Sequence, residues 1–306
     1  MKFAYYPGCS ATGTSADYEV STQEVCRALG ASLEELDDWN CCGSTPAHAT
    51  DTELSAALCA RNLSIAAGTG AETLLTPCPS CLSNLRHAAH RMEDPVFRNR
   101  VDQLLDEPSA PAFPKVDSVM QALVETFGYD LIAQRATRKF TGIRLAPYYG
   151  CLMSRPAEIM NFGDPENPTM MEGLLEACGA DVLDFPLKTN CCGASYGIPE
   201  RSMTARLSGE ILRVAQNMEA DAIVVACPLC QMNLDLRQAQ AAKAMDASFN
   251  IPVLYFTQVL GLAFGLGSDK LGLAKLCVSP APLLDKLDAA RAGRVTSAVT
   301  ATEVRP

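Results

Sequence analysis

Short apolar runs alternate with amphipathic stretches along the chain, and this alternation predicts an α/β fold. Lys2 to Tyr6 and Thr73 to Thr76 are short, mainly apolar runs next to Pro or Gly, as expected of buried strands. Two helical patterns lie between them, one from Tyr18 to Leu29 and one that begins at Asp51 and ends at Gly68. Strands that alternate with helices are typical of a small parallel sheet flanked by helices.

Other stretches extend this prediction. Leu33 to Leu36 and Val182 to Phe185 both stand shortly before a Cys-Cys step, which favours a strand at each place. Residues 92 to 115 contain four prolines and therefore predict an irregular connection. The segment from Ser279 is rich in Ala, Pro and charge, and no function is assigned to it.

One arrangement of cysteines occurs twice: a lone Cys, a Cys-Cys-Gly step and a Cys-Pro-x-Cys step. The cysteines of the first copy are Cys9, Cys41, Cys42, Cys78 and Cys81. Those of the second copy are Cys151, Cys191, Cys192, Cys227 and Cys230. The surroundings repeat as well, because a Tyr-Tyr pair stands near each lone Cys and Asn-Leu follows each Cys-Pro-x-Cys step. A duplication therefore places ten of the fourteen cysteines.

This repeat predicts two domains, each with one copy of the cysteine pattern: residues 1–140, and residues 141–306 with a C-terminal tail. The matching residues continue beyond the cysteines, since residues 116–128 and 253–265 share their spacing. In parallel sheets, ligands lie beyond the carboxyl ends of the strands, which is where the cysteines of each copy are expected. A pseudo-twofold axis is expected to bring the two cysteine sets face to face, with Gly43 and Gly193 lining the gap.

Composition excludes several classes of function. The formal charge of −10 argues against nucleic acid as a partner. The longest candidate for a membrane span, Ile251 to Leu266, has 16 residues with interrupting Pro and Gly, whereas a membrane-spanning helix needs about 20 mainly apolar residues. No secretory signal precedes Cys9, so we expect a cytoplasmic protein, with peripheral membrane contact through a partner left open.

Four kinds of chemistry compete for the clustered cysteines. In a reducing compartment, disulfides are less common than metal or redox sites, and a thioredoxin-like pair needs only two thiols. Zinc accepts four thiolates in a closed tetrahedron, so five cysteines per copy exceed its needs. An iron–sulfur cluster suits five thiolates better than a single ion does. The residues favour the cluster, with zinc as the alternative.

The tandem pattern of Cys, Cys-Cys-Gly and Cys-x-x-Cys resembles the B subunit of heterodisulfide reductase, a family defined by its tandem cysteine-rich CCG domain. All ten cysteines match, and the resemblance covers nearly the whole chain. It implies that each domain holds a noncubane 4Fe-4S cluster on its five cysteines. It also implies that the two clusters face a shared cleft, in which a disulfide is cleaved or formed.

The resemblance implies partners too: a C-type iron–sulfur subunit, a flavin-containing A-type subunit, and a disulfide or thiol as substrate. The same tandem domain occurs in an extra subunit of some succinate dehydrogenases and in subunits of lactate or glycolate oxidation systems. The alternative function is therefore a non-catalytic electron-relay subunit of such a dehydrogenase-type complex.

Ten thiolates make a strongly negative site, so an anionic substrate requires basic residues nearby. The candidates are His48 after the first Cys-Cys step, Arg155 after Cys151, and Lys188 before the second Cys-Cys step. A solvated surface charge is the alternative for each of them.

Four cysteines and four glycines complete the set of candidates. The cysteines outside the motif, Cys26, Cys59, Cys178 and Cys277, are predicted to be small buried core residues. The glycines beside the motif cysteines, Gly8, Gly43, Gly150 and Gly193, are predicted to let the backbone approach the cluster closely.

Overall fold

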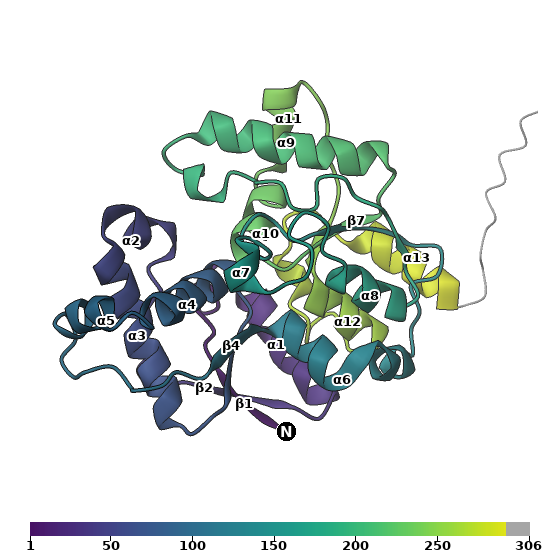
Figure 1. Ribbon diagram of the computed structural model, residues 1–306. Helices are drawn as coiled ribbons and strands as arrows, with labels where there is room; N and C mark the ends of the chain where they lie inside the picture. The colour runs from purple at the N-terminus through teal and green to yellow at the C-terminus, as the bar shows by residue number, and fades with distance from the viewer. Residues whose placement is uncertain (292–306) are drawn as a thin grey trace, which may run out of the picture.

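Two parallel four-stranded sheets form the framework of the protein (Figure 1), and this computed structural model describes residues 1–291. The first sheet contains β1 (Lys2–Tyr5), β2 (Ser32–Glu35), β3 (Thr73–Thr76) and β4 (Lys115–Ser118), in the order β2-β1-β3-β4. The second contains β5 (Arg144–Tyr148), β6 (Asp181–Val182), β7 (Ala222–Val225) and β8 (Val253–Tyr255), in the order β6-β5-β7-β8. The equivalent orders confirm the predicted α/β fold and its duplication.

Helices connect the strands of each sheet. Those of the first half are α1 (Ala16–Ala28), α2 (Ser44–Thr50), α3 (Thr52–Gly68), α4 (Pro79–Arg91), α5 (Pro95–Asp102) and α6 (Val119–Arg135). The α-helices of the second half are α7 (Ala157–Met160), α8 (Met170–Ala177), α9 (Arg201–Asn217), α10 (Pro228–Leu234), α11 (Gln238–Met245), α12 (Phe256–Ala263) and α13 (Ala281–Arg291). The second half also contains two 3₁₀ turns, η1 (Ala194–Tyr196) and η2 (Leu273–Lys275).

The two sheets have the same strand register: residues at equivalent positions of the two halves pair in the same way within their own sheet. Ala4 of β1 pairs with Leu74 of β3, and Ala146 of β5 pairs with Ile223 of β7. All four side chains are buried, as expected for a parallel sheet with helices on both faces. The end of each central strand therefore delivers its lone Cys to the same edge of its sheet.

The two halves interlock by exchanging helix contacts. Helix α6, which follows β4, packs on α8 of the second half, and α12, which follows β8, packs on α1 of the first half. On the α1–α12 side, the rings of Tyr18 and Tyr255 stack with centroids 4.0 Å apart, and the hydroxyls of Ser21 and Thr257 lie 2.7 Å apart. Reciprocal contacts of this kind are what a pseudo-twofold axis produces. The domain boundary at residue 140 stays a prediction.

Three stretches differ from the expectation. The proline-containing connection holds helix α5, because Pro95 occupies the first turn, where no backbone N–H is needed, and the Asp94 side chain accepts a hydrogen bond from Val96 N. Strand β6 ends at Val182, so the predicted strand to Phe185 is wrong for its last three residues. The segment from Ser279 begins with α13, which buries Leu283 and Leu287; its residues 292–306 lie outside the described part.

No helix within residues 1–291 is long and apolar enough to cross a membrane.

Candidate functional site

Equivalent tyrosines fix the loops that carry the first three cysteines of each set. Tyr6, three residues before Cys9, donates a hydrogen bond from its hydroxyl to Asn40 O at 2.9 Å. Tyr148, three residues before Cys151, donates to Asn190 O at 2.5 Å. Both tyrosines are fully buried, and each accepting Asn directly precedes a Cys-Cys step. The lone Cys and the Cys-Cys step of each copy are therefore held together by one buried bond.

The Cys-Pro-x-Cys steps begin helices. Cys78 caps α4 and Cys227 caps α10, with Pro in the first turn of each helix. Proline suits this position because its fixed φ is helical and its missing N–H would have had no partner. The second thiol of each step, from Cys81 or Cys230, lies buried in the same first turn. Two thiols thus meet at each helix N-terminus, where the helix dipole favours negative charge.

The sulfurs of each set converge. Cys42 Sγ lies 3.4 Å from Cys81 Sγ, and Cys192 Sγ lies 3.5 Å from Cys230 Sγ. The asparagine after each Cys-Pro-x-Cys step holds this arrangement. Asn84 Nδ2 donates to Cys42 O at 3.1 Å and lies 3.7 Å from its sulfur. Asn233 makes the same two contacts to Cys192, at 3.3 and 3.6 Å.

A glycine leaves room for sulfur in each set. Gly8 and Gly150 have φ of +76° and +72°, in the left-handed region that favours glycine. A Cβ at Gly8 would lie 2.9 Å from Cys81 Sγ, and one at Gly150 would lie 2.8 Å from Cys230 Sγ. Both lone cysteines therefore follow a residue that cannot carry a side chain. Gly43 and Gly193 differ, since a Cβ there would meet Ala47 or Thr204.

The local electrostatics favour thiolates at several of these positions. Hydrogen bonds from the Cys41 and Cys81 thiols lower the pKa of Cys42, and a hydrogen bond from Cys230 lowers the pKa of Cys192. The pKa of Cys78 is lowered by the Cys81 thiol and by backbone N–H groups at the start of α4. Thiolates are the form that binds metal, so these cysteines could serve as metal ligands.

Each set has a buried side and an open side. Six of the ten motif cysteines are buried, whereas Cys9, Cys41 and Cys191 are exposed and Cys151 is half-buried. The buried thiols come from the second Cys of each Cys-Cys step and from the Cys-Pro-x-Cys steps. A group bound by one set would be held by the protein on one face and reachable on the other.

Two contacts join the first cysteine set to the second. The buried Tyr18 hydroxyl lies 3.1 Å from Pro77 O and 3.2 Å from Ala226 O, which are the residues just before Cys78 and Cys227. The loops after the two Cys-Cys steps also touch, because Ser195 Oγ donates to Thr45 Oγ1 at 2.9 Å. Both kinds of cysteine step therefore approach their counterparts across the boundary between the halves.

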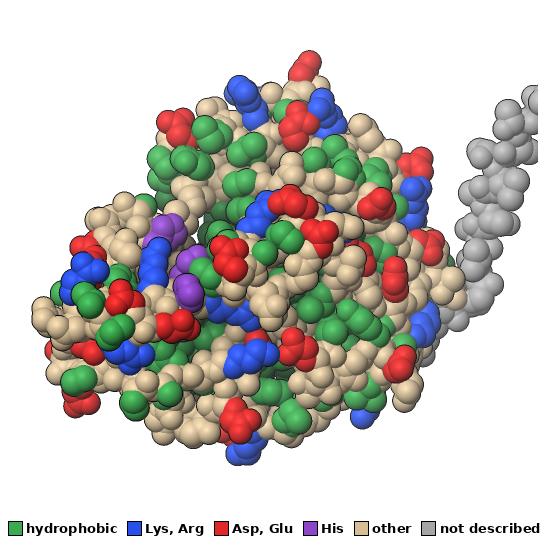
Figure 2. Space-filling view, in the orientation of Figure 1, with side chains coloured by type: hydrophobic (Ala, Val, Ile, Leu, Met, Phe, Trp, Pro, Cys, Tyr) green, Lys and Arg blue, Asp and Glu red, His purple; other side chains and the backbone are tan. Residues whose placement is uncertain are grey.

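The structure brings two of the three candidate basic residues together. His48 on α2 and Arg155 in the loop after Cys151 line one pocket, and Figure 2 shows histidine and basic side chains gathered beside a hollow in this face. Arg155 also donates to Thr189 O at 3.1 Å, close to the second Cys-Cys step.

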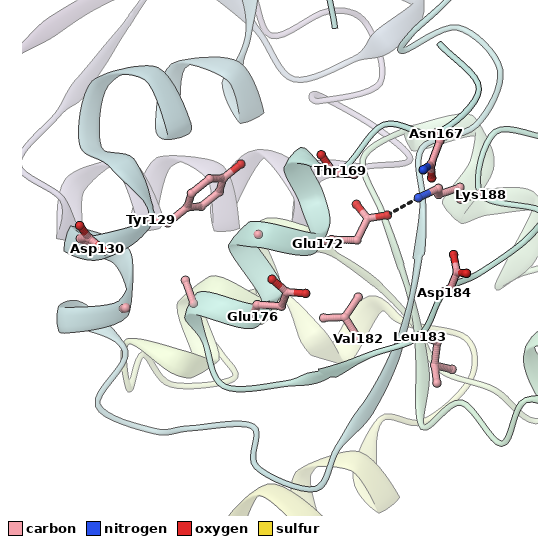
Figure 3. Close-up of a pocket in the computed structure, with 13 residues that line it drawn as sticks. Tyr129, Asp130, Asn167, Thr169, Glu172, Glu176, Val182, Leu183, Asp184 and Lys188 are labelled. Atoms are coloured by element: carbon pink, nitrogen blue, oxygen red, sulfur yellow. Dashed lines mark hydrogen bonds and ion pairs between the residues drawn. The ribbon is translucent and has the colours of Figure 1, made fainter. Parts of the chain in front are cut away.

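Lys188 lies in another pocket, between α6 and α8 (Figure 3). Its Nζ is 2.7 Å from Glu172 Oε1, and both side chains are largely buried. The charge of Lys188 is thereby neutralised within the protein. Its backbone carbonyl accepts hydrogen bonds from Tyr149 N and Gly150 N, so this residue shapes the loop that carries Cys151.

The cysteines outside the motif do not behave alike. Cys26, Cys59 and Cys178 are buried, as predicted, whereas Cys277 is exposed, so that prediction is wrong for Cys277. Cys277 follows the short turn η2, and its backbone N–H donates to Asp235 at 2.7 Å, which holds the chain at the surface. Cys59 Sγ lies 3.6 Å from Cys42 O, so it supports the loop of a motif cysteine.

Sequence reasoning missed Tyr18, His87 and Arg91, which the fold adds to this region. Tyr18 was seen only as an apolar position of a helix, and its partners lie 59 and 208 residues away. His87 and Arg91 stand four residues apart on α4 and share a pocket with His48. Their spacing of one helical turn after Cys-Pro-x-Cys was the only available signal.

The donor set fits a multinuclear iron–sulfur group. Each set offers five thiols, favours thiolates at some of them, and brings the backbone of Gly8 or Gly150 close to a buried sulfur. Within residues 1–291, no group of three or more His, Cys, Asp or Glu side chains is arranged as a site for one metal ion. A multinuclear group is held by several thiolates on different irons, and each set offers enough cysteines for that.

Comparison with known proteins identifies the repeat. The cysteine-rich domain family named CCG matches residues 3–86 and again residues 145–235. The membrane anchor subunit of the 8-methylmenaquinol:fumarate reductase of Wolinella succinogenes is 30% identical over 274 residues, covering 89% of this chain and 95% of that protein. The heterodisulfide reductase B-subunit-like protein of Archaeoglobus profundus is 29% identical, covering 92% and 95%.

Two further comparisons agree with the fold and the repeat. The B subunit of a ferredoxin/F420H2-dependent CoB-CoM heterodisulfide reductase from Methanosarcina acetivorans is 28% identical, covering 95% of this chain and 99% of that protein. The crystal structure of a hypothetical protein from Helicobacter pylori has the same fold, with a TM-score of 0.73 at 13% identity. That alignment covers 91% of this chain and 52% of the Helicobacter protein. The chain therefore belongs to the family of tandem cysteine-rich CCG domain proteins that includes the B subunits of heterodisulfide reductases.

Proposed function

We propose that this protein is the iron–sulfur catalytic subunit of a heterodisulfide reductase-like complex, which cleaves or forms a disulfide between its two cysteine sets. The observation that carries the proposal is the approach of the two sets. Tyr18 joins the residues before Cys78 and Cys227, and the Thr45–Ser195 hydrogen bond joins the loops after the two Cys-Cys steps. A small substrate at this junction reaches both sets.

Each set of five cysteines would hold one noncubane 4Fe-4S cluster. When bound, two such clusters would supply electrons one at a time, and together they match the two electrons that convert one disulfide into two thiols, while the two protons come from solvent. The protein's own part is to hold the thiolates. The Tyr6 and Tyr148 hydrogen bonds fix the loops, and Asn84 and Asn233 fix the buried sulfurs.

The open side of each set is where substrate would arrive. Cys9, Cys41 and Cys191 are exposed, so their thiolates leave one face of each site accessible. His48 and Arg155 stand beside this region and would attract an anionic substrate toward it. Lys188, the third substrate candidate, would act through its backbone contacts to the Cys151 loop, because its ammonium is paired with Glu172.

The electrons would come from partner subunits of the complex. We propose a C-type iron–sulfur subunit and a flavin-containing A-type subunit, in keeping with the relatives that are named as subunits of heterodisulfide reductases. The protein would act in the cytoplasm, and any contact with a membrane would pass through a partner.

The second candidate function is electron relay in a succinate or lactate/glycolate dehydrogenase-type complex. The observation that favours it is the 30% identity to a protein named as a subunit of a fumarate reductase. A relay needs one cysteine set near a partner surface, whereas disulfide cleavage needs both sets at one substrate. The two functions therefore differ in whether the second set is indispensable.

The test is disulfide cleavage by protein produced without oxygen. We expect about eight irons and a comparable amount of acid-labile sulfide per chain, as two four-iron clusters require. With reduced viologen as electron donor, this protein should convert small disulfides to two thiols each, while the same protein stripped of iron should not. If viologen reduces the iron-loaded protein but the protein cleaves neither charged nor neutral disulfides, the disulfide reductase function is refuted and the electron-relay function is favoured.

A further inference from the structure

A small pocket at the boundary between the halves is lined by basic side chains. It has a volume of about 290 Å³ and lies between α2, α3, α4 and the loop of residues 152–156. The basic side chains are His48, His87, Arg91 and Arg155. The remaining lining residues are hydroxyl, amide or apolar residues, and no Asp or Glu is among them.

This lining contrasts with the rest of an acidic molecule. The whole chain carries a formal charge of −10. The larger pocket beside Lys188 is lined by four carboxylates: Asp130, Glu172, Glu176 and Asp184. A lining that holds two arginines and two histidines and no carboxylate favours anions over cations.

The basic groups have capacity left for a ligand. The Arg91 guanidinium is exposed and makes no hydrogen bond or ion pair with another side chain within residues 1–291. His87 uses Nδ1 to donate to Ser83 O at 2.7 Å, which leaves Nε2 available. Arg155 has no nitrogen left over, because Nε and Nη2 donate to the exposed Glu166 and Nη1 donates to Thr189 O. Arg91 is thus the strongest unpaired charge of the pocket.

The pocket adjoins both cysteine sets. Asn84 forms part of its wall and contacts Cys42 O and Sγ with the same side chain. Leu152 forms the opposite wall and directly follows Cys151. A molecule in the pocket would therefore contact Asn84, which touches Cys42 of the first set, and Leu152, which adjoins Cys151 of the second.

We propose that this pocket binds the anionic arm of the sulfur substrate, a thiol or disulfide that carries a carboxylate or another oxyanion. This inference rests on the proposed function and specifies its substrate class. The volume is at the lower limit of ligand pockets, which suits one arm of a substrate better than a whole cofactor. With the charged arm held by Arg91, His87 and His48, the sulfur end would extend toward Cys42, which Asn84 contacts, and toward Cys151, which precedes Leu152.

The experiment compares two probes that differ in charge alone: 3,3′-dithiodipropionate and its diamide. Binding is measured by anaerobic calorimetry on the iron-loaded protein, with no electron donor, so that no turnover occurs. We expect the dicarboxylate to bind about tenfold more tightly than the diamide, the effect of one charge-assisted hydrogen-bonded contact. Added salt should reduce this difference.

The decisive variant is Arg91→Gln, and its matched control is Arg135→Gln, which removes an exposed arginine at the end of α6. Arg91→Gln should abolish most of the tenfold preference and leave diamide binding unchanged, while Arg135→Gln should change neither. Iron content checks that both variants fold. An unchanged preference in Arg91→Gln, equal binding of both probes by the parent protein, or no saturable binding of the dicarboxylate would overturn the proposal.

This outcome is separable from the fate of the proposed function. Arg91-dependent binding without cleavage of either probe would refute the disulfide reductase function and keep the anion pocket. Cleavage of both probes at equal rates, with no effect of Arg91→Gln on binding or rate, would keep the function and refute the pocket.

Discussion

The two cysteine copies share a hydrogen-bonded frame but differ in what surrounds it. Tyr6 and Tyr148, Asn84 and Asn233, and Gly8 and Gly150 occupy equivalent places around their sulfurs. After Cys-Cys-Gly, however, the first copy forms the seven-residue helix α2, whereas the second forms the three-residue turn η1. The shared frame holds the cysteines of both sets in the same way. The structural differences after Cys-Cys-Gly therefore point to a role that only one half has.

The difference falls on the side of the basic pocket. Helix α2 carries His48, and the first-half helix α4 has 13 residues and carries His87 and Arg91 in its later turns. Its counterpart α10 has seven residues and ends before an equivalent position. The first half thus presents charge to a ligand, while the second half contributes the loop after Cys151. If the proposed function holds, this asymmetry suits a substrate with two unlike ends.

Removal of one buried thiol should have the largest effect on iron content and on disulfide cleavage. We expect Cys81→Ser and Cys230→Ser each to lose or convert one cluster and to retain the other, because each set is drawn from one half. Iron analysis should show a loss of up to about half of the parent content. Cleavage of small disulfides should stop in both variants.

One-electron reduction of the remaining cluster, followed by electron paramagnetic resonance, checks that half of the site survives. If either variant kept disulfide cleavage at the parent rate, the two sets would not act on one substrate, and the electron-relay function would be favoured.

Filling the space beside a buried sulfur should have the next largest effect. Gly150→Ala places a Cβ against Cys230 Sγ and forces alanine to φ +72°, which costs about 1–3 kcal/mol before any effect on the cluster. Gly8→Ala should act equally on the first set. Gly142→Ala is the matched control, because that glycine has φ +75° with nothing near its Cβ position.

All three variants should lose stability in urea unfolding, but only Gly8→Ala and Gly150→Ala should also lose iron. Equal loss of iron in Gly142→Ala would mean that backbone strain, rather than crowding of sulfur, governs cluster binding.

The contact between the halves allows a smaller and sharper test. Tyr18→Phe removes the hydroxyl that lies between Pro77 O and Ala226 O and leaves buried carbonyls without this partner, which costs about 1–3 kcal/mol. Tyr255 is the other ring of the stacked pair. Its hydroxyl is buried without a hydrogen-bond partner in the described residues, and Tyr255→Phe removes only this hydroxyl. It should be neutral or slightly stabilising in urea unfolding. Equal effects of the two substitutions would show that ring stacking, not the hydroxyl, joins the halves.

These comparisons also show what the sequence predicts. The strand Thr73–Thr76 and the helix begun by Asp51 were predictable, because an apolar run and a capping carboxylate act locally. Helix α5 was not, because Pro95 reads as a breaker unless its place in the first turn is known. The two cysteine sets followed from the duplication, since a repeated pattern needs no knowledge of the fold, and their role as cluster ligands stays a prediction.

The surroundings of the site could not be predicted in the same way. Arg155 was a candidate because it follows Cys151, and the fold places it beside His48. Lys188 was a candidate on the same grounds, yet its ammonium pairs with Glu172, 16 residues earlier. Tyr18 depends on which helix of one half packs on the other. Such pairings are set by tertiary packing, and local spacing carries no information about them.

The smallest expected effect concerns a cysteine that is not part of the motif. Cys59 Sγ lies 3.6 Å from Cys42 O, and in the second half Ser208 Oγ donates to Cys192 O at 3.0 Å. The two side chains therefore occupy equivalent places, and the second half performs this role with a hydroxyl. Cys59→Ser should keep the full iron content and change the free energy of unfolding by less than about 1 kcal/mol, because serine can make the same hydrogen bond. Loss of as much iron as in Cys81→Ser would instead make Cys59 a ligand, and the division between motif and supporting cysteines would be wrong.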